Sequence, residues 1–310
     1  MKKITVIGMV KNSADIIESF IRCNAIWAER FVLLNNMSTD RTKEILESLI
    51  KEGFNIEIID DNEDSYCQSE KMNKLLRYTV DKYETDYVIV LDDDEILICD
   101  NPEKSVNEIL EYLPDDNLYY AGWKMYIPTE VDDQDDNCIP RKMRFRLDDQ
   151  LEIIKKIIIP VRIIDDSFSI AQGNHFAFGD RINNHINIVA LRIAHFPIRS
   201  AEQLKSKALI GWTNYMLMDN RSISHGIHWK GFYDVVKEGK ELTIDAMQLM
   251  VLAYYSSWEA DKVNIIVDPV ELPEERFKML YTGQKEINSI KNYINHVEKI
   301  IEDMKNVENS

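Results

Sequence analysis

The chain has 310 residues, of which 45% are hydrophobic and 29% are charged, so it can bury a sizeable core and is not an intrinsically disordered protein. Its formal net charge of −17 argues against nonspecific binding to nucleic acid, whose phosphate backbone is also negative. The N-terminal apolar run ends at Lys11, too early for a signal peptide, and no apolar stretch reaches the roughly 20 residues that a membrane span needs. We therefore expect a cytoplasmic protein, with peripheral contact at the inner face of a membrane left open.

The first hundred residues alternate between two kinds of hydrophobic period. Apolar runs predict strands, and amphipathic stripes between them predict helices, one after Ser13, one between Thr39 and Gly53 and one over 66–83. The four predicted strands cover 3–10, 31–34, 55–60 and 87–91. Such alternation predicts an α/β fold in which helices flank a mostly parallel, doubly wound sheet.

The pattern changes after residue 100. We expect a helix at 101–113, a strand at 117–128 and a highly acidic loop at 129–137. Further strand-like segments lie at 141–147, 151–164, 167–171 and 187–198, and helix-like segments lie at 200–219, 243–259 and 284–305. These segments divide the chain into a sheet domain over 1–200 and a mainly helical C-terminal extension over 201–310, packed on that domain.

The last predicted helix carries one apolar stripe, formed by Ile287, Ile290, Tyr293, Ile294, Val297 and Ile301. Core packing is the default expectation for such a stripe. Pairing with a second subunit and contact with a membrane surface are the two alternatives.

Four acids, Asp92 to Glu95, directly follow the predicted strand 87–91, which is apolar at every position. Ligands of doubly wound sheets gather at the carboxyl ends of the strands, and polar residues also follow the other three strands. In an extended chain Asp92 and Asp94 would face one side, and Asp93 and Glu95 the other, where they would hold the turn. Two carboxylates on one side favour a bound cation such as Mn²⁺ or Mg²⁺. A solvated acidic turn is the alternative.

Five segments together resemble the family-2 glycosyltransferases of the GT-A fold. Three follow predicted strands, namely MVKNSADIIESFI (9–21), NNMSTDRTKEIL (35–46) and VLDDDEIL (90–97). Two lie later, namely QGNHFAF (172–178) and HFPIRSAEQLKSK (195–207). The chain looks closest to the subgroup with a D-x-D-E metal motif, a V-K-N-E motif and a histidine-proline-arginine-serine segment. It departs from the pattern at Ser13, which replaces the glutamate of V-K-N-E, and at Asn35 or Asn36, where the family usually has aspartate.

The resemblance implies a GT-A-type sheet, a nucleotide-diphosphate sugar as donor and a divalent metal, Mn²⁺ or Mg²⁺, on its diphosphate. A uridine-diphosphate sugar is the favoured donor. The implied metal ligands are Asp94, with Asp92 in the metal shell or on the ribose, and His195 as a metal or diphosphate contact. The acceptor implied is a glycan or lipid-linked sugar of surface polysaccharide. The implied contacts at the nucleoside end are Asn12, Asn35 and Asn36, with Val10 and Asp93 as further nucleotide-sugar contacts.

Other candidates follow from position in the chain. Gln68 and Lys71 lie near the end of the third strand, within reach of a nucleotide, and the basic residues Arg199, Lys205 and Lys207 suit a diphosphate. Asn174 and His175 are candidates for acceptor contact or for loop structure. A single inverting displacement needs a carboxylate that deprotonates the acceptor hydroxyl. Its identity is unresolved among Glu130, Asp166 and Asp180.

Two other classes of function fit part of the pattern. A sugar nucleotidyltransferase has a similar sheet and similar acids, but normally a glycine-rich basic loop after the first strand, where this chain has GMVKNSAD. A noncatalytic nucleotide- or glycan-binding module is the other, and Asp92 and Asp94 argue against it. A Rossmann dehydrogenase is excluded, because no G-x-G-x-x-G follows the first strand.

Overall fold

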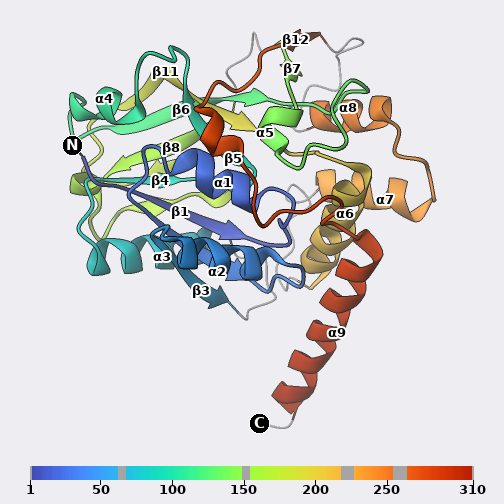
Figure 1. The fold of residues 1–310 in the computed structure, drawn as a ribbon. Coiled ribbons are helices and arrows are strands. Elements are labelled where there is room, and N and C mark those ends of the chain that lie inside the picture. The colour runs from blue at the N-terminus through green and yellow to red at the C-terminus, as the bar shows by residue number, and fades with distance from the viewer. Residues whose placement is uncertain (1, 62–67, 149–153, 218–226, 254–263, 309–310) are drawn as a thin grey trace.

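The core of the molecule is an eight-stranded sheet with the order β3-β2-β1-β4-β8-β6-β11-β5, seen along its length in Figure 1. The computed structural model describes residues 2–61, 68–148, 154–217, 227–253 and 264–308. The sheet strands are β1 (Ile4–Val10), β2 (Arg30–Asn36), β3 (Ile56–Asp61), β4 (Tyr87–Val90), β5 (Glu95–Cys99), β6 (Leu118–Met125), β8 (Lys155–Pro160) and β11 (His185–His195).

Strand direction decides which residues share an edge of this sheet. β3, β2, β1 and β4 are mutually parallel, and β6 and β11 run the same way. β8 lies antiparallel between β4 and β6, and β5 lies antiparallel to β11. The ends of the six like-directed strands therefore meet at one edge, and the starts of β8 and β5 meet there as well.

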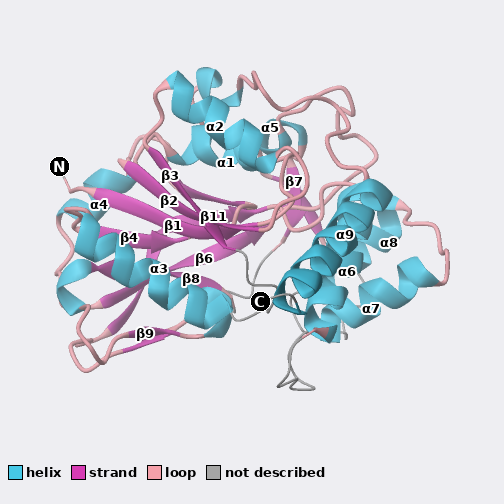
Figure 2. Cartoon of the chain, turned by 90° about the horizontal axis from the view of Figure 1, so that it is seen from below, coloured by secondary structure: helices cyan, strands magenta, loops and turns pink. Residues whose placement is uncertain are grey.

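Helices cover both faces, as Figure 2 shows. On one face α1 (Ile17–Asn24), α2 (Thr42–Glu52) and α4 (Val106–Glu111) bury Phe20, Leu46 and Leu110. On the other face α3 (Gln68–Lys82) buries Met72, Leu75 and Leu76 against Ile7 and Val90. Both faces of the parallel strands are thus apolar, as a sheet covered by helices on both sides requires. The α/β fold predicted for this chain, a mostly parallel sheet flanked by helices, is confirmed.

The C-terminal third is mainly helical. It contains α6 (Ala201–Met216), α7 (Ile227–Lys237), α8 (Ile244–Ala253) and α9 (Ser289–Glu308). Buried Glu18 of α1 holds part of this region in place, because its carboxylate accepts the backbone N–H groups of residues 280, 281 and 282 at 2.7–2.9 Å. Arg22 donates to Glu18 at 2.9 Å, so the buried charge is paired.

Small elements complete the fold. They are α5 (Ile139–Lys142), β7 (Phe145–Leu147) paired with β12 (Ile265–Val267), and β9 (Ser169–Ile170) paired with β10 (Ala177–Phe178). Single turns of 3₁₀ helix lie at Val161–Ile163, Gln172–Asn174 and Glu274–Phe277. No helix among the described residues is long and apolar enough to cross a membrane.

The structure departs from the sequence predictions in several segments. Residues 141–147 are only part strand, because Pro140 lies at the start of a helix that runs to Lys142. Strand β5 and helix α7 were not predicted. Of the strand expected over 151–164, β8 forms 155–160 and a 3₁₀ turn follows, while 151–153 lie outside the described residues. The ends of the helices expected over 66–83, 200–219 and 243–259 also lie partly outside them.

The last helix departs most clearly from expectation. We expected its apolar stripe to pack on the core, but Ile290, Ile294 and Ile301 are exposed. The face that packs against α6 is largely polar and includes Asn292 and His296. This face forms hydrogen bonds with polar side chains of α6. The periodicity of apolar residues cannot predict contacts of this kind.

Gly8 of β1 allows a close backbone approach beside the acidic run. A Cβ atom at this position would lie 2.4 Å from the carbonyl oxygen of Leu91, the residue before Asp92. We expect Gly8→Ala to lower the free energy of unfolding by about 1–3 kcal/mol, because the neighbouring backbone must shift. Denaturant unfolding followed by circular dichroism measures this change.

Gly231→Ala in α7 is the matched control for that substitution. A Cβ at Gly231 meets nothing within 4 Å, so alanine should stabilise the helix by up to about 1 kcal/mol. Equal effects of the two substitutions would contradict the close approach at Gly8.

Candidate active site

The acidic run forms a turn between β4 and β5. The N–H of Glu95 donates to the carbonyl of Asp92 at 3.1 Å, and the N–H of Asp92 donates to the Glu95 carboxylate at 2.8 Å. The expectation that Asp92 and Asp94 face one side rested on an extended chain and is wrong, because a turn does not alternate its side chains. The two carboxylates contact different cations.

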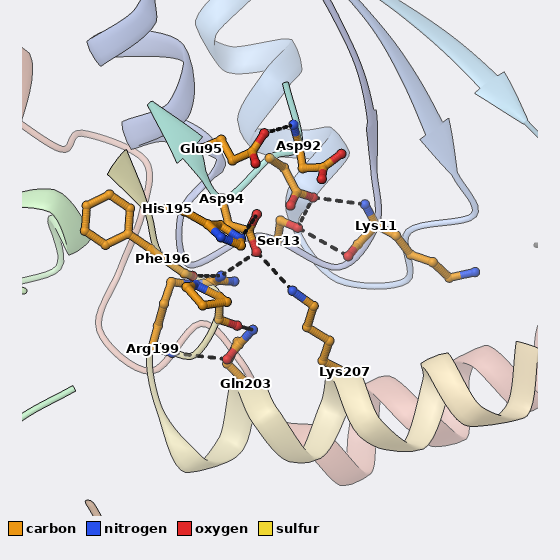
Figure 3. Close-up of polar contacts among 12 residues, drawn as sticks. Lys11, Ser13, Asp92, Asp94, Glu95, His195, Phe196, Arg199, Gln203 and Lys207 are labelled. Carbon is orange, nitrogen blue, oxygen red and sulfur yellow. Dashed lines mark hydrogen bonds and ion pairs between the residues drawn. The ribbon is translucent and has the colours of Figure 1, made fainter. Parts of the chain in front are cut away.

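Asp94 is the acid most enclosed by positive charge. Its carboxylate lies 2.9 Å from Nζ of Lys207, 3.7 Å from the Arg199 guanidinium and 3.3 Å from Nε2 of His195 (Figure 3). Burial alone would raise the pKa of Asp94, but Lys207, His195 and Arg199 hold it well below its ordinary value. Asp94 is therefore a fixed negative charge at the edge of the sheet.

The partners of Asp94 come from the end of β11 and from α6. Arg199 lies in the segment before α6 and forms a bidentate pair with Asp15 at 2.7 and 2.9 Å. Its third contact is the carbonyl of Phe196 at 2.9 Å, so the guanidinium is fixed in place. Lys207 lies in the second turn of α6, and its ammonium reaches back to Asp94 in the acidic turn (Figure 3).

His195 ends β11, between Glu95 of β5 and Met125 of β6 in the sheet register. Its ring lies 4.1 Å from that of Trp123, and its Nδ1 lies 3.1 Å from Sδ of Met125. Burial lowers the pKa of His195 although Asp94 opposes the shift. A neutral imidazole beside a carboxylate is a donor set that can bind a metal.

Asp92 faces a second cation, Lys156, which is 0% exposed. Nζ of Lys156 lies 2.5 Å from Asp92 and 3.4 Å from Glu95, and both acids raise the pKa of the lysine against the effect of burial. Burial raises the pKa of Glu95 well above its ordinary value. Lys156 reaches this edge because β8 runs antiparallel, so its start lies beside the end of β4.

Asp93 binds the loop after β1. It accepts hydrogen bonds from the hydroxyl of Ser13 and from the N–H of Lys11, the latter at 3.3 Å. Burial, and next the charge of Asp94, raise the pKa of Asp93 to about 7. Asp93 thus holds the turn, as expected, and ties it to the β1 loop.

The candidate nucleoside end is a chain of polar contacts across β1, β2 and β3. Asn35 donates to Asp60 at 2.8 Å and Asn36 donates to Asp61 at 2.7 Å. Nζ of Lys11 lies 3.1 Å from Asn36, and Nζ of Lys71 lies 2.7 Å from Asp61.

Asn12 closes the same end of the site with a left-handed backbone, φ 52°. Its Oδ1 accepts the N–H groups of Thr39 and Asp40 at 2.7 and 3.3 Å, which joins the loops after β1 and β2. Val10, the last residue of β1, is buried in the core and offers only its backbone to a ligand.

The 172–175 segment lies over the turn of the acids. Asn174 is 3.4 Å from Asp92, and the N–H of Gly173 donates to Gln68 at 3.2 Å. His175 contacts the carbonyl of Lys155 at 2.8 Å and lies edge-on to Trp123. Burial, and next Lys156, lower the pKa of His175 to about 4. The structure thus brings Gln68, Asn174 and His175 to the side of Asp92.

Other candidates lie away from the acids. Lys205 contacts Glu202 at 3.0 Å on another face of α6 than Lys207. Asp166 and Asp180 are exposed near Ser167, beyond the end of β8, and this end pairs with the start of β4, not with its carboxyl end. Glu130 is exposed but follows β6, whose end lies at the same edge as His195.

Sequence reasoning missed several residues of the site. The main ones are Ser13, Asp15, Asp61 and Lys156. The available signal for Lys156 was a lysine inside an apolar strand, which needs a buried acid as its partner.

A divalent metal fits this site only when a phosphate-bearing substrate supplies part of its coordination shell. Among the described residues, no cluster of three or more acidic, histidine or cysteine side chains could hold a metal ion. The pair Asp94 and His195 supplies one carboxylate and one neutral imidazole within 3.3 Å. Mn²⁺ and Mg²⁺ take few protein ligands when phosphates and water complete the shell, so this pair fits such an ion.

A family model described as glycosyl transferase family 2 matches residues 5–163, which hold β1 to β4, the acidic turn and Lys156. The chain belongs to this family. This glycosyltransferase matches no curated protein. The assignment fits a sheet whose carboxyl edge gathers fixed acids and cations.

Several solved structures are similar to this glycosyltransferase at low identity. TarS 1–349 from S. aureus shares 12% identity and a TM-score of 0.40, with 87% of this chain and 97% of that chain covered. Glucosyl-3-phosphoglycerate synthase from Mycobacterium tuberculosis, in complex with Mn²⁺, uridine-diphosphate-glucose and phosphoglyceric acid, shares 16% identity and a TM-score of 0.35. That match covers 71% of this chain and 82% of the other.

Proposed function

We propose that this glycosyltransferase is metal-dependent and inverting, and that it moves a sugar from a nucleotide-diphosphate sugar to a hydroxyl of a glycan or lipid-linked acceptor. A uridine-diphosphate sugar is the proposed donor, and synthesis of surface polysaccharide is the proposed setting. The observation that carries the proposal is Asp94, a buried acid held ionised by Lys207 and Arg199 beside neutral His195. The proposed subgroup is the one with the D-x-D-E motif.

The chain's own cations prepare the site for a diphosphate. Lys207 and Lys11 lie at the carboxyl edge of the sheet and would bind the phosphate oxygens, while Arg199 is fixed by Asp15 and keeps Asp94 in place. Asp94 and His195 would hold the metal, which neutralises charge on the departing diphosphate. Asn12, Asn35 and Asn36 would receive the nucleoside.

The reaction balances without a covalent enzyme intermediate. The acceptor oxygen forms a bond to the anomeric carbon as the bond from that carbon to the diphosphate oxygen breaks, and the diphosphate leaves with the electron pair. A carboxylate takes the acceptor's proton. Of the three candidate bases, Glu130 is the one that follows a strand end at the edge of the site, so we propose it for this role.

A sugar nucleotidyltransferase and a noncatalytic binding module are the competing functions. The first would release pyrophosphate from a nucleoside triphosphate and a sugar phosphate. The second would bind a nucleotide sugar and release no nucleotide. The products therefore separate all three functions.

The deciding experiment measures the melting temperature of the full chain with UDP-glucose, UDP-N-acetylglucosamine, GDP-mannose and dTDP-glucose, each with and without Mn²⁺. A donor at about 100 times its dissociation constant should add about 2.7 kcal/mol to the free energy of unfolding. We expect one donor to stabilise the protein and Mn²⁺ to enlarge the effect. No stabilisation by any member of the panel would contradict the proposal, and binding without nucleotide release to any acceptor would favour the module.

A further inference from the structure

Helix α9 turns its polar face to the protein and its apolar face outward. On the packed face, Ser289 donates to Glu202 at 2.7 Å, Asn292 to Ser206 at 3.3 Å, and His296 contacts Asn214 at 2.7 Å. On the outer face, Ile290 is 62% exposed, Ile294 50%, Ile301 44% and Met304 62%. The C-terminal half of α9 projects beyond the rest of the molecule (Figure 1). The helix therefore exposes an apolar stripe to water, which is unfavourable unless a partner covers it.

The spacing of this stripe is that of a coiled-coil seam. With half-buried Val297 included, the apolar residues 290, 294, 297, 301 and 304 follow one another at steps of four and three. Alternating steps of this kind define the a and d positions of a heptad, whose side chains insert between those of a facing helix. The stripe thus favours a helix as its partner.

A groove of about 640 Å³ lies along the first half of the seam. Val236 of α7, Ile290 and Ile294 provide its apolar lining, and Lys205 and Lys291 are among its polar residues. The seam continues past the groove onto the projecting half of α9, which carries Ile301 and Met304. Each chain therefore has both a groove and an apolar projection.

The charges beside the seam select one arrangement. Lys291 and Glu298 occupy successive e positions, and e positions face each other in antiparallel pairs. One antiparallel register sets Ile301 against Ile290 and Ile294 against Val297, and it sets Lys291 against Glu298 in both directions. Moving it by one heptad sets Glu298 against Glu298, which is unfavourable. A parallel pair would instead set Glu298 against the neutral Tyr293 and Lys305 against the neutral Ile300, so neither contact would be an ion pair.

We propose that the chain forms an antiparallel homodimer through α9, in which the projecting half of each helix lies in the groove of the other copy. The interface is two-fold symmetric, as a self-complementary patch requires. The exposed charges beside the seam balance, with Lys291 and Lys305 opposed by Glu298 and Glu302, which disfavours an anionic membrane as the partner.

Sedimentation equilibrium of the full chain at micromolar concentration tests the proposal. We expect twice the chain mass, and we expect Ile294→Asp or Ile301→Asp to raise the dissociation constant of the dimer by about a hundredfold or more. Leu249→Asp is the matched control, because Leu249 is an apolar residue of α8 that is at least as exposed as Ile294 and Ile301, at 60%, and lies outside the seam. It should leave the dimer intact.

A charge exchange tests the register separately. Lys291→Glu should weaken the dimer by setting two carboxylates together, and Lys291→Glu with Glu298→Lys should restore it. A monomeric wild-type chain would overturn the proposal, as would a dimer equally tolerant of Ile301→Asp and Leu249→Asp. Flotation of a monomeric chain with phosphatidylglycerol vesicles would also overturn it, in favour of a membrane.

Discussion

Asp94→Asn is expected to lower the rate of sugar transfer by about 10²–10⁴-fold, the size of effect that follows from removing a charge aimed at a leaving group. The substitution keeps the shape of the side chain and takes away the charge that pairs with Lys207 and that would hold the metal with His195. The Asp94 carboxylate also keeps Lys207 in position, at 2.9 Å. We therefore expect the Mn²⁺-dependent part of the thermal shift with the donor sugar to disappear as well.

Asp93→Asn is the control for this prediction. Asp93 is the neighbouring acid, its pKa is raised to about 7, and its partners are Ser13 and the backbone of Lys11. An amide oxygen can still accept both hydrogen bonds, so we expect a loss below about 10-fold. Steady-state release of nucleotide, with circular dichroism as a check on folding, measures both. Equal losses of transfer rate in the two variants would contradict the proposal that Asp94 holds the metal.

Lys156→Met is expected to lower the free energy of unfolding by about 3–5 kcal/mol, the cost of leaving a buried charge without its partner. Lys156 and Glu95 are both fully buried, and the ammonium lies between Asp92 and Glu95. Methionine fills the same volume, so a cavity contributes little. Urea denaturation of the wild-type and variant proteins measures the difference.

Two further variants give this prediction its control. Lys156→Met with Glu95→Gln removes the buried ammonium together with the buried carboxyl group that lies beside it, and we expect it to recover most of the lost stability. Lys155→Met changes the adjacent lysine, whose ammonium contacts Asn187 at 2.8 Å near solvent, and should cost less than about 1 kcal/mol. If Lys155→Met and Lys156→Met cost the same, the buried pair is not what stabilises this edge.

The first hundred residues illustrate what local pattern can predict. The strands at 3–10, 31–34, 55–60 and 87–91 appear as β1 to β4, because an apolar run between helices has one stable place in a covered sheet. Gly53 ends α2 with φ 111°, as a glycine after a helix predicts. These elements depend on neighbours close in sequence.

The site is formed by contacts between residues far apart in the sequence, which a local sequence pattern cannot predict. Asp94 meets His195 and Lys207 over about a hundred residues of chain, and only the family resemblance indicated that His195 belonged with it. Lys156 could be noticed as a lysine in an apolar strand, but its partner could not be named, because that depends on the direction of the strand. The predicted directions of the side chains at 92–95 were wrong for another reason. Side chains alternate between two sides only in strands, and these residues form a turn.

The antiparallel course of β8 has a consequence for how related chains vary. It puts residue 156 on the strand next to the one that leads into Asp92 and Glu95, so the three positions form one electrostatic unit drawn from two distant segments. A chain that loses the lysine keeps a buried glutamate it cannot easily ionise. Positions 95 and 156 should therefore change together among relatives, with a neutral residue at one accompanied by a neutral residue at the other.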